Sequence, residues 1–220
     1  MPSASVERSA RRRTWIKFCG CTSWDDVAAS IGAGADAVGF IFAPSPRRIA
    51  WEAAWEIARK LSSAVAAVGV FVDPSARDVD AARSLFSEMT VQLCGTETAD
   101  LVARYGDRAI KAIGVGEATT TNDLDQACSA YDRALILFDT KDARVAGGTG
   151  RTFDWATVAP ISRRRSVIVA GGLTPENVGD CVRAVRPFGV DVRSGVETHG
   201  RKDPAKMRAF VRAVRAADEA

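Results

Sequence analysis

The sequence predicts an α/β fold, a single (β/α)8 TIM barrel formed by residues 14–220. Eight short apolar runs alternate with eight helical patterns along the chain. The runs are apolar throughout, as at residues 67–72, which is typical of parallel strands covered on both faces. A length of 220 residues suits one such barrel. An open doubly wound sheet is the alternative, but its Gly-x-Gly-x-x-Gly fingerprint does not follow the first strand.

Each predicted strand leads into a predicted helix. We expect strands near residues 14–19, 36–42, 66–72, 90–93, 108–113, 133–138, 166–170 and 188–192. We expect helices near residues 23–33, 51–62, 75–87, 97–105, 121–130, 154–161, 174–185 and 203–217. The segments Thr22-Ser23 and Asp73-Pro74-Ser75 stand where the first and third helices need capping oxygens. In the seventh helix, Pro175 stands at a predicted first helical position.

Composition excludes several classes of protein. A net charge of +3 and short arginine runs at residues 11–13 and 163–165 do not make a nucleic-acid-binding stripe. No apolar run approaches the roughly 18 residues needed to cross a membrane. Residues 1–13 are polar and lack the apolar core of a secretory signal, so we expect a disordered tail. The sequence therefore predicts a cytoplasmic protein without a nucleic-acid or membrane partner.

Cysteine and histidine usage limits the chemistry. The five cysteines have no disulfide-framework spacing, so we expect free thiols. His199 is the only histidine, which makes a Ser-His-Asp triad or a histidine-rich metal site improbable. We expect neither a metal ion nor a cofactor.

Two reactive side chains stand at predicted strand tips. Cys19 ends the first strand and Asp139 follows the sixth. In a barrel both face the mouth at the carboxyl ends of the strands, where they can act as a base and an acid. Strand alternation places Lys17 on the same face as Cys19, one layer lower. Considered alone, Cys19 is typical of a small buried apolar residue. Asp139 considered alone is typical of a helix cap or a loop carboxylate.

The loops after the seventh and eighth strands carry glycines that let backbone N–H groups approach an anion. Gly171 and Gly172 lie in the first loop, and Ser194 and Gly195 lie in the second. Barrels often bind phosphate at this position, so we expect a phosphate site there. The alternative is that these glycines only form turns.

Two other loops offer candidate contacts. Residues 147–150 are glycine-rich and either fold over a ligand or form a plain flexible loop. Arg47, after the second strand, can pair with a ligand carboxylate through two hydrogen bonds, although taken alone it reads as a surface arginine.

As an ordered set, these motifs resemble the phosphoribosylanthranilate isomerase family of tryptophan biosynthesis. The resemblance covers about residues 15 to 217 and begins with Lys17-Phe18-Cys19-Gly20-Cys21-Thr22. It continues through residues 34–42, 45–47, 69–72, 91–93, 138–141, 147–155, 171–178, 190–191 and 194–197. Any single motif is weak, but the ordered set is highly specific.

The resemblance implies an Amadori rearrangement of a phosphosugar–anthranilate substrate without a cofactor. By matched position, Asp139 is the general acid, Cys19 the general base and Arg47 the partner of the anthranilate carboxylate. Asp191 joins Gly171, Gly172, Ser194 and Gly195 among the expected substrate-binding residues. These roles require a Cys19 thiolate and an Asp139 whose pKa is raised.

The chain departs from the family pattern at two positions. Cys94 stands where the family usually has histidine, and Arg193 stands where it usually has serine. Asp191 and Arg193 share one face of the last strand, which neighbours the first strand in a closed barrel. We therefore expect Asp191 to pair with Lys17 inside the barrel. Arg193 either sits at the mouth, where it would lower the pKa of Cys19, or leans into solvent.

Two other functions compete with this one. The histidine-pathway barrel isomerase catalyses the same rearrangement on a larger substrate, but it would need an acidic residue in place of Cys19 and another near Gly114. A non-catalytic phosphosugar-binding barrel would not need both Cys19 and Asp139. The sequence leaves open whether the protein is a monomer or a homodimer.

Overall fold

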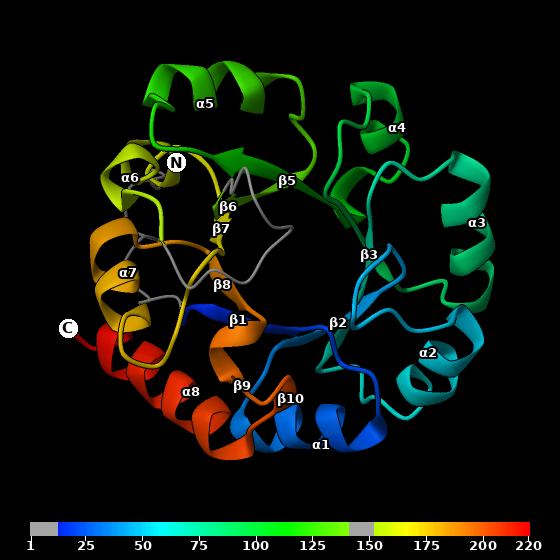
Figure 1. The fold of residues 1–220 in the computed structure, drawn as a ribbon. Helices are drawn as coiled ribbons and strands as arrows, with labels where there is room; N and C mark the ends of the chain where they lie inside the picture. Colours follow the sequence, from blue (N-terminus) through cyan, green and yellow to red (C-terminus); the bar gives the residue numbers. More distant parts are fainter. Residues whose placement is uncertain (1–12, 141–151) are drawn as a thin grey trace, which may run out of the picture.

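Eight parallel strands close into a barrel in the computed structural model, which describes residues 13–140 and 152–220 (Figure 1). The strands pair in chain order, and the first pairs with the last. This confirms the predicted fold class. The strands are β1 (Trp15–Cys19), β2 (Ala37–Ile41), β3 (Ala66–Phe71), β4 (Thr90–Leu93), β5 (Ala109–Val115), β6 (Leu135–Thr140), β7 (Val167–Val169) and β8 (Gly189–Val192).

The helices form a ring outside the strands (Figure 1). Within the two predicted capping segments, Ser23 and Ser75 cap α1 and α3, and each accepts a hydrogen bond from a backbone N–H of the first turn. Helix α8 packs beside both α7 and α1, which completes the ring. The helices are α1 (Trp24–Ala33), α2 (Trp51–Ala58), α3 (Ala76–Leu85), α4 (Ala99–Ala103), α5 (Thr121–Ser129), α6 (Ala159–Ser162), α7 (Val178–Val185) and α8 (Pro204–Asp218).

Two predictions about local structure were wrong. Helix α7 begins at Val178 rather than at Pro175, because the Asn177 side chain ties the preceding loop together. Its amide donates to the carbonyl of Gly172 at 2.9 Å and accepts from the backbone N–H of Thr174 at 2.8 Å. The predicted helix at 154–161 is instead a 3-10 turn followed by the short α6.

A small hairpin after β8 was also missed. Strands β9 (Glu197–Thr198) and β10 (Arg201–Lys202) pair antiparallel across a two-residue turn. His199 (φ 50°) and Gly200 (φ 74°) both adopt positive φ, as tight hairpin turns of this kind require. The hairpin sets the positions of Glu197 and Lys202 beside the barrel mouth.

Most of the predicted tail and all of the glycine-rich loop fall on residues that the structure does not describe. Arg13 is described, and its guanidinium pairs with Asp36 at 2.5 Å. Residues 1–12 and the glycine-rich residues 147–150 lie outside the described part of the chain. Within the described part, no helix is long and apolar enough to cross a membrane. All five cysteines are free thiols, as expected.

The barrel interior holds a buried ion pair. Lys17 of β1 is fully buried, and its Nζ lies 2.9 Å from Oδ1 of Asp191, its register partner on β8. This confirms the predicted pairing. Gly39 of β2 makes room for it, since a Cβ there would lie 3.1 Å from Lys17 Nζ and 2.9 Å from Cys19 Sγ. The pair is therefore enclosed by the first, second and last strands.

The Lys17→Met variant should lose about 3–5 kcal/mol of unfolding free energy, because Asp191 would remain as an unpaired buried carboxylate. Urea unfolding followed by circular dichroism measures this loss. Arg59→Met, which removes one member of an exposed pair with Glu56, should change stability by less than about 1 kcal/mol. An unchanged midpoint for Lys17→Met would contradict a stabilising role for the pair.

Candidate active site

The predicted site residues meet at the carboxyl end of the barrel. Cys19 ends β1, and Asp139 is the last residue but one of β6. The Lys17–Asp191 ion pair lies close enough to both residues that its charges shift the pKa of Cys19 and of Asp139. The closed barrel thus brings together side chains that lie 120 positions apart in the sequence.

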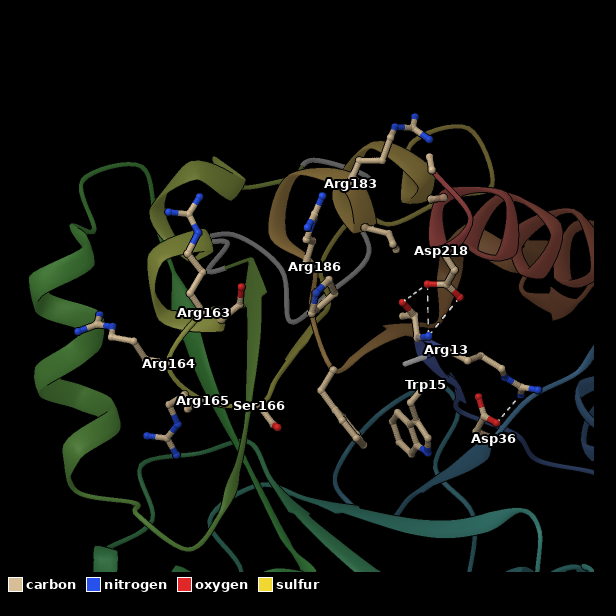
Figure 2. Close-up of a pocket in the computed structure, with 17 residues that line it drawn as sticks. Arg13, Trp15, Asp36, Arg163, Arg164, Arg165, Ser166, Arg183, Arg186 and Asp218 are labelled. Carbon is tan, nitrogen blue, oxygen red and sulfur yellow. Dashed lines mark hydrogen bonds and ion pairs between the residues drawn. The ribbon is translucent and has the colours of Figure 1, made fainter. Parts of the chain in front are cut away.

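A cavity of about 920 Å³ lies at the opposite end of the barrel (Figure 2). It is lined by residues at or just before the starts of strands, including Trp15, Asp36, Arg165 and Phe188, and by the end of α8. None of the strand-tip residues takes part in it. The cavity is therefore separate from the candidate active site.

Cys19 is nearly enclosed, with 6% of its surface exposed. Burial raises the pKa of its thiol, and the negative charge of Asp191 adds to this, while the ammonium of Lys17 opposes it. Lys17 keeps its own proton: burial would lower its pKa, but Asp191 and Cys19 raise it on balance. Burial therefore opposes the thiolate that the role of a general base requires, while the neighbouring cation of Lys17 favours it.

Asp139 has the electrostatics of an acid. Burial, followed by the charge of Asp191, raises its pKa to about 6, against the opposing effects of the Thr140 backbone N–H and of Arg193 and Lys17. The direction agrees with the sequence-based expectation. At neutral pH the carboxyl is thus far closer to its protonated form than an exposed aspartate.

The glycine-rich loops after β7 and β8 lie against each other and against Asp139. Gly171 (φ 80°) approaches Asp139 so closely that a Cβ would lie 2.8 Å from its Oδ1. At Gly195 a Cβ would lie 1.9 Å from the carbonyl oxygen of Leu173, so that position accepts only glycine. Gly172 (φ 64°) and Ser194 complete this surface, which consists mostly of backbone.

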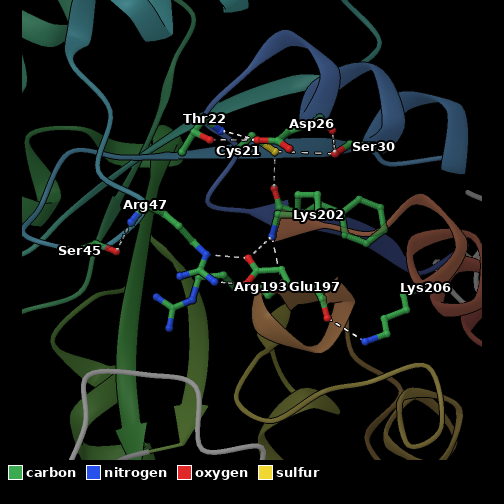
Figure 3. Close-up of polar contacts among 11 residues, drawn as sticks. Cys21, Thr22, Asp26, Ser30, Ser45, Arg47, Arg193, Glu197, Lys202 and Lys206 are labelled. Atoms are coloured by element: carbon green, nitrogen blue, oxygen red, sulfur yellow. Dashed lines mark hydrogen bonds and ion pairs between the residues drawn. The ribbon is translucent and has the colours of Figure 1, made fainter. Parts of the chain in front are cut away.

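Arg47 follows β2 and is held by Glu197, a residue to which the sequence assigned no role. Its Nε donates to Oε1 of Glu197 at 2.8 Å, and a second guanidinium nitrogen contacts Oε2 (Figure 3). Lys202 binds the same carboxylate at 3.0 Å. The only sequence signal was that Glu197 belongs to the motif at 194–197.

The two departures from the family pattern have different surroundings. Arg193 is half-buried, and its side chain packs over Gly20 beside Arg47 rather than extending into solvent (Figure 3). Cys94 accepts a hydrogen bond from Gln92 at 3.3 Å, but burial still raises the pKa of its thiol to about 12. Burial therefore favours the neutral thiol at Cys94. Among the described residues, no group of three or more acidic, cysteine or histidine side chains is arranged to hold a metal ion.

The raised pKa of Asp139 has a consequence for stability. Because its folded pKa of about 6 exceeds the unfolded value of about 3.9, the ionised carboxylate destabilises the fold above pH 6. Asp139→Asn should therefore raise the unfolding free energy by about 1–3 kcal/mol at pH 8, and the gain should shrink as the pH falls from 6 to 4. Urea unfolding at several pH values measures this, with exposed Asp132→Asn as the control. A gain that grows toward low pH would contradict the assignment.

The comparisons with known proteins agree with this geometry. Residues 16–213 match the family model described as N-(5'phosphoribosyl)anthranilate (PRA) isomerase. The N-(5'-phosphoribosyl)anthranilate isomerases of Desulforudis audaxviator and Nitrosococcus oceani are 43% and 42% identical over 93% and 92% of this chain, and over 99% and 98% of their own lengths.

Solved structures show the same fold. The phosphoribosyl anthranilate isomerase of Thermotoga maritima superposes with a TM-score of 0.83 at 38% identity, over 92% of this chain and 99% of its own. A phosphoribosyl anthranilate isomerase in complex with reduced 1-(o-carboxyphenylamino)-1-deoxyribulose 5-phosphate superposes with a TM-score of 0.80 at 36% identity, over the same shares of the two chains. Together with the matched family model, these relatives show that the chain belongs to the N-(5'-phosphoribosyl)anthranilate isomerase family.

Proposed function

We propose that the protein converts N-(5-phosphoribosyl)anthranilate into 1-(2-carboxyphenylamino)-1-deoxyribulose 5-phosphate, a step of tryptophan biosynthesis. Membership of the isomerase family supports this activity. The observation that carries the proposal is the placement of Cys19 and Asp139 at one end of the barrel, linked by the Lys17–Asp191 pair. This arrangement offers one group that accepts a proton and one that gives a proton.

In this proposal the reaction has two proton transfers. Asp139 protonates the furanose ring oxygen, and the bond from that oxygen to C1 breaks as the lone pair of the anthranilate nitrogen forms a C1=N iminium. Cys19 as the thiolate then takes the C2 proton, and the electrons of that C–H bond form the enolamine. Tautomerisation of the enolamine gives the ketone. Each general acid or base of this kind typically contributes about 10²–10⁴-fold in rate.

Binding would use the two sides of the mouth. The loops with Gly171, Gly172, Ser194 and Gly195 offer backbone N–H groups to the phosphate. Arg47 offers its guanidinium to the anthranilate carboxylate, but it already binds Glu197, so it approaches the substrate as part of an ion pair.

In this proposal Asp191 also has a role besides the substrate contact that the resemblance implied. Its Oδ1 bonds to Lys17, so in this proposal it holds the ammonium beside Cys19, and its charge raises the pKa of Asp139. Direct contact between Asp191 and substrate stays a prediction.

The reaction uses a protonated Asp139 and a deprotonated Cys19, but in the free protein the pKa of Asp139 is the lower of the two. Asp139 has a pKa of about 6, and that of Cys19 lies above the usual value of a thiol, about 8.5. The form that carries the thiolate together with the protonated carboxyl is therefore a minor one in the free enzyme. In this proposal, this minor form is the one that reacts, and Lys17 stabilises it.

No observation favours the histidine-pathway reaction. The tip of β5 carries Gly114 and Val115 rather than an acidic side chain, and β1 ends in Cys19. Oligomeric state and cytoplasmic location stay predictions. One Thermotoga maritima relative is described as a dimeric phosphoribosylanthranilate isomerase.

Cys19→Ser and Asp139→Asn should each lower kcat/KM by roughly 10³-fold or more, or about 4 kcal/mol of transition-state stabilisation. Mixing with N-(5-phosphoribosyl)anthranilate and following anthranilate-type fluorescence measures turnover. Cys94→Ser, with its thiol bonded to Gln92, is the matched control for Cys19→Ser. Substrate binding without turnover in the wild type would instead indicate a non-catalytic phosphosugar-binding barrel.

The pH profile tests the order of the two pKa values. We expect kcat/KM to fall below about pH 6, to stay level through neutral pH, and to fall again only above the usual thiol value of about 8.5. Lys17→Met should shift the alkaline limb upward, because removing a cation raises the thiol pKa. A steady decline from pH 6 to pH 8 would show that the thiol titrates below Asp139 and would contradict the proposed order.

A further inference from the structure

Arg193 is positioned at the barrel mouth without a counter-ion. No hydrogen bond or ion pair engages its guanidinium among residues 13–140 and 152–220. Its backbone is fixed, because the Lys202 ammonium donates to its carbonyl oxygen at 3.1 Å. The side chain is nevertheless half-buried, which is unfavourable for a cation unless a ligand or partner compensates it.

The direction of the side chain is set by Gly20. A Cβ on Gly20 would lie 3.5 Å from both Cγ and Cδ of Arg193 and 3.2 Å from Cδ of Arg47. The two arginine side chains therefore converge over the end of β1, and Figure 3 shows their guanidinium groups close together. Arg193 thus leans from β8 toward the end of β1 and toward Arg47 after β2.

The two nearest buried carboxylates, those of Glu197 and Asp191, already have cationic partners. Glu197 binds both Arg47 and Lys202, and Asp191 binds Lys17. Asp139 interacts electrostatically with Arg193, but its pKa of about 6 means that it gives up part of its charge near neutral pH. Glu197 is shared by Arg47 and Lys202, and the guanidinium of Arg193 adds a further positive charge at this part of the mouth. An anion placed between the two arginines would be bound by both.

We propose that Arg193 is a substrate-specificity residue: together with Arg47 it binds the carboxylate on the aromatic ring of the substrate. This inference rests on the proposed function and extends it to a residue at which the chain departs from the family pattern. Serine at this position has no charge to offer, whereas arginine supplies a second planar pair of donors. The pair of arginines selects phosphoribosyl substrates whose amine carries an acidic group, and the backbone loops after β7 and β8 bind the phosphate end.

The test compares substrates with and without the carboxylate, N-(5-phosphoribosyl)anthranilate and N-(5-phosphoribosyl)aniline. Arg193→Ser should lower kcat/KM for the anthranilate substrate by about 10- to 100-fold, mainly through KM, as expected for loss of a charge-assisted hydrogen bond. It should change kcat/KM for the aniline substrate by less than about threefold. Arg193→Lys should restore part of the loss, and Arg212→Ser, an exposed arginine on α8, should change neither value.

Binding of a non-reactive ligand separates this inference from the proposed activity. Reduced 1-(o-carboxyphenylamino)-1-deoxyribulose 5-phosphate and its counterpart without the carboxylate are titrated by calorimetry against wild type and Arg193→Ser. Weakened binding of the carboxylated ligand alone supports the inference even if the wild type shows no turnover.

Two outcomes would overturn the inference. Equal losses for both ligands, together with weaker competition by inorganic phosphate, would place Arg193 at the phosphate. No loss for either ligand would show that Arg193 does not contact the substrate.

Discussion

The ion pair between Lys17 and Asp191 is the constraint on which the rest of the site depends. It lies inside the barrel at the junction of β1 and β8, where the sheet closes. Its two charges are too costly to bury separately, so the closure of the barrel and the pairing require each other. The pair also determines the electrostatics of the mouth, because its cation faces Cys19 and its anion raises the pKa of Asp139.

Burial of the site also lowers the population of its reactive form, in which Cys19 is the thiolate and Asp139 is protonated. Desolvation raises the pKa of both Cys19 and Asp139, which favours the acid and disfavours the base. The nearly enclosed thiol of Cys19 cannot ionise freely, and the charges of Lys17 and, to a smaller extent, Lys202 oppose this effect. The barrel thus holds the two groups in fixed positions at the cost of a low population of the thiolate form.

Charge also organises the rim. Glu197 comes from a two-stranded hairpin after β8, yet it binds Arg47 from the loop after β2 and Lys202 from the hairpin itself. These contacts lie across the β8–β1 junction and fix one side of the mouth, while the opposite loops consist of glycine backbone. One side of the mouth is therefore specialised for charged side chains and the other for backbone N–H groups.

The sequence by itself determined the barrel, the strand-tip positions of Cys19 and Asp139 and the pairing of Lys17 with Asp191, because apolar runs, side-chain alternation and ring closure follow from local pattern. Tertiary structure decided the start of α7, the β9–β10 hairpin, the partner of Arg47 and the raised pKa of Cys19. Each of these depends on atoms far apart in the chain or on the removal of water, neither of which a local pattern records. The direction of Arg193 belongs with them, since it is set by Gly20 and Arg47 on other strands and loops.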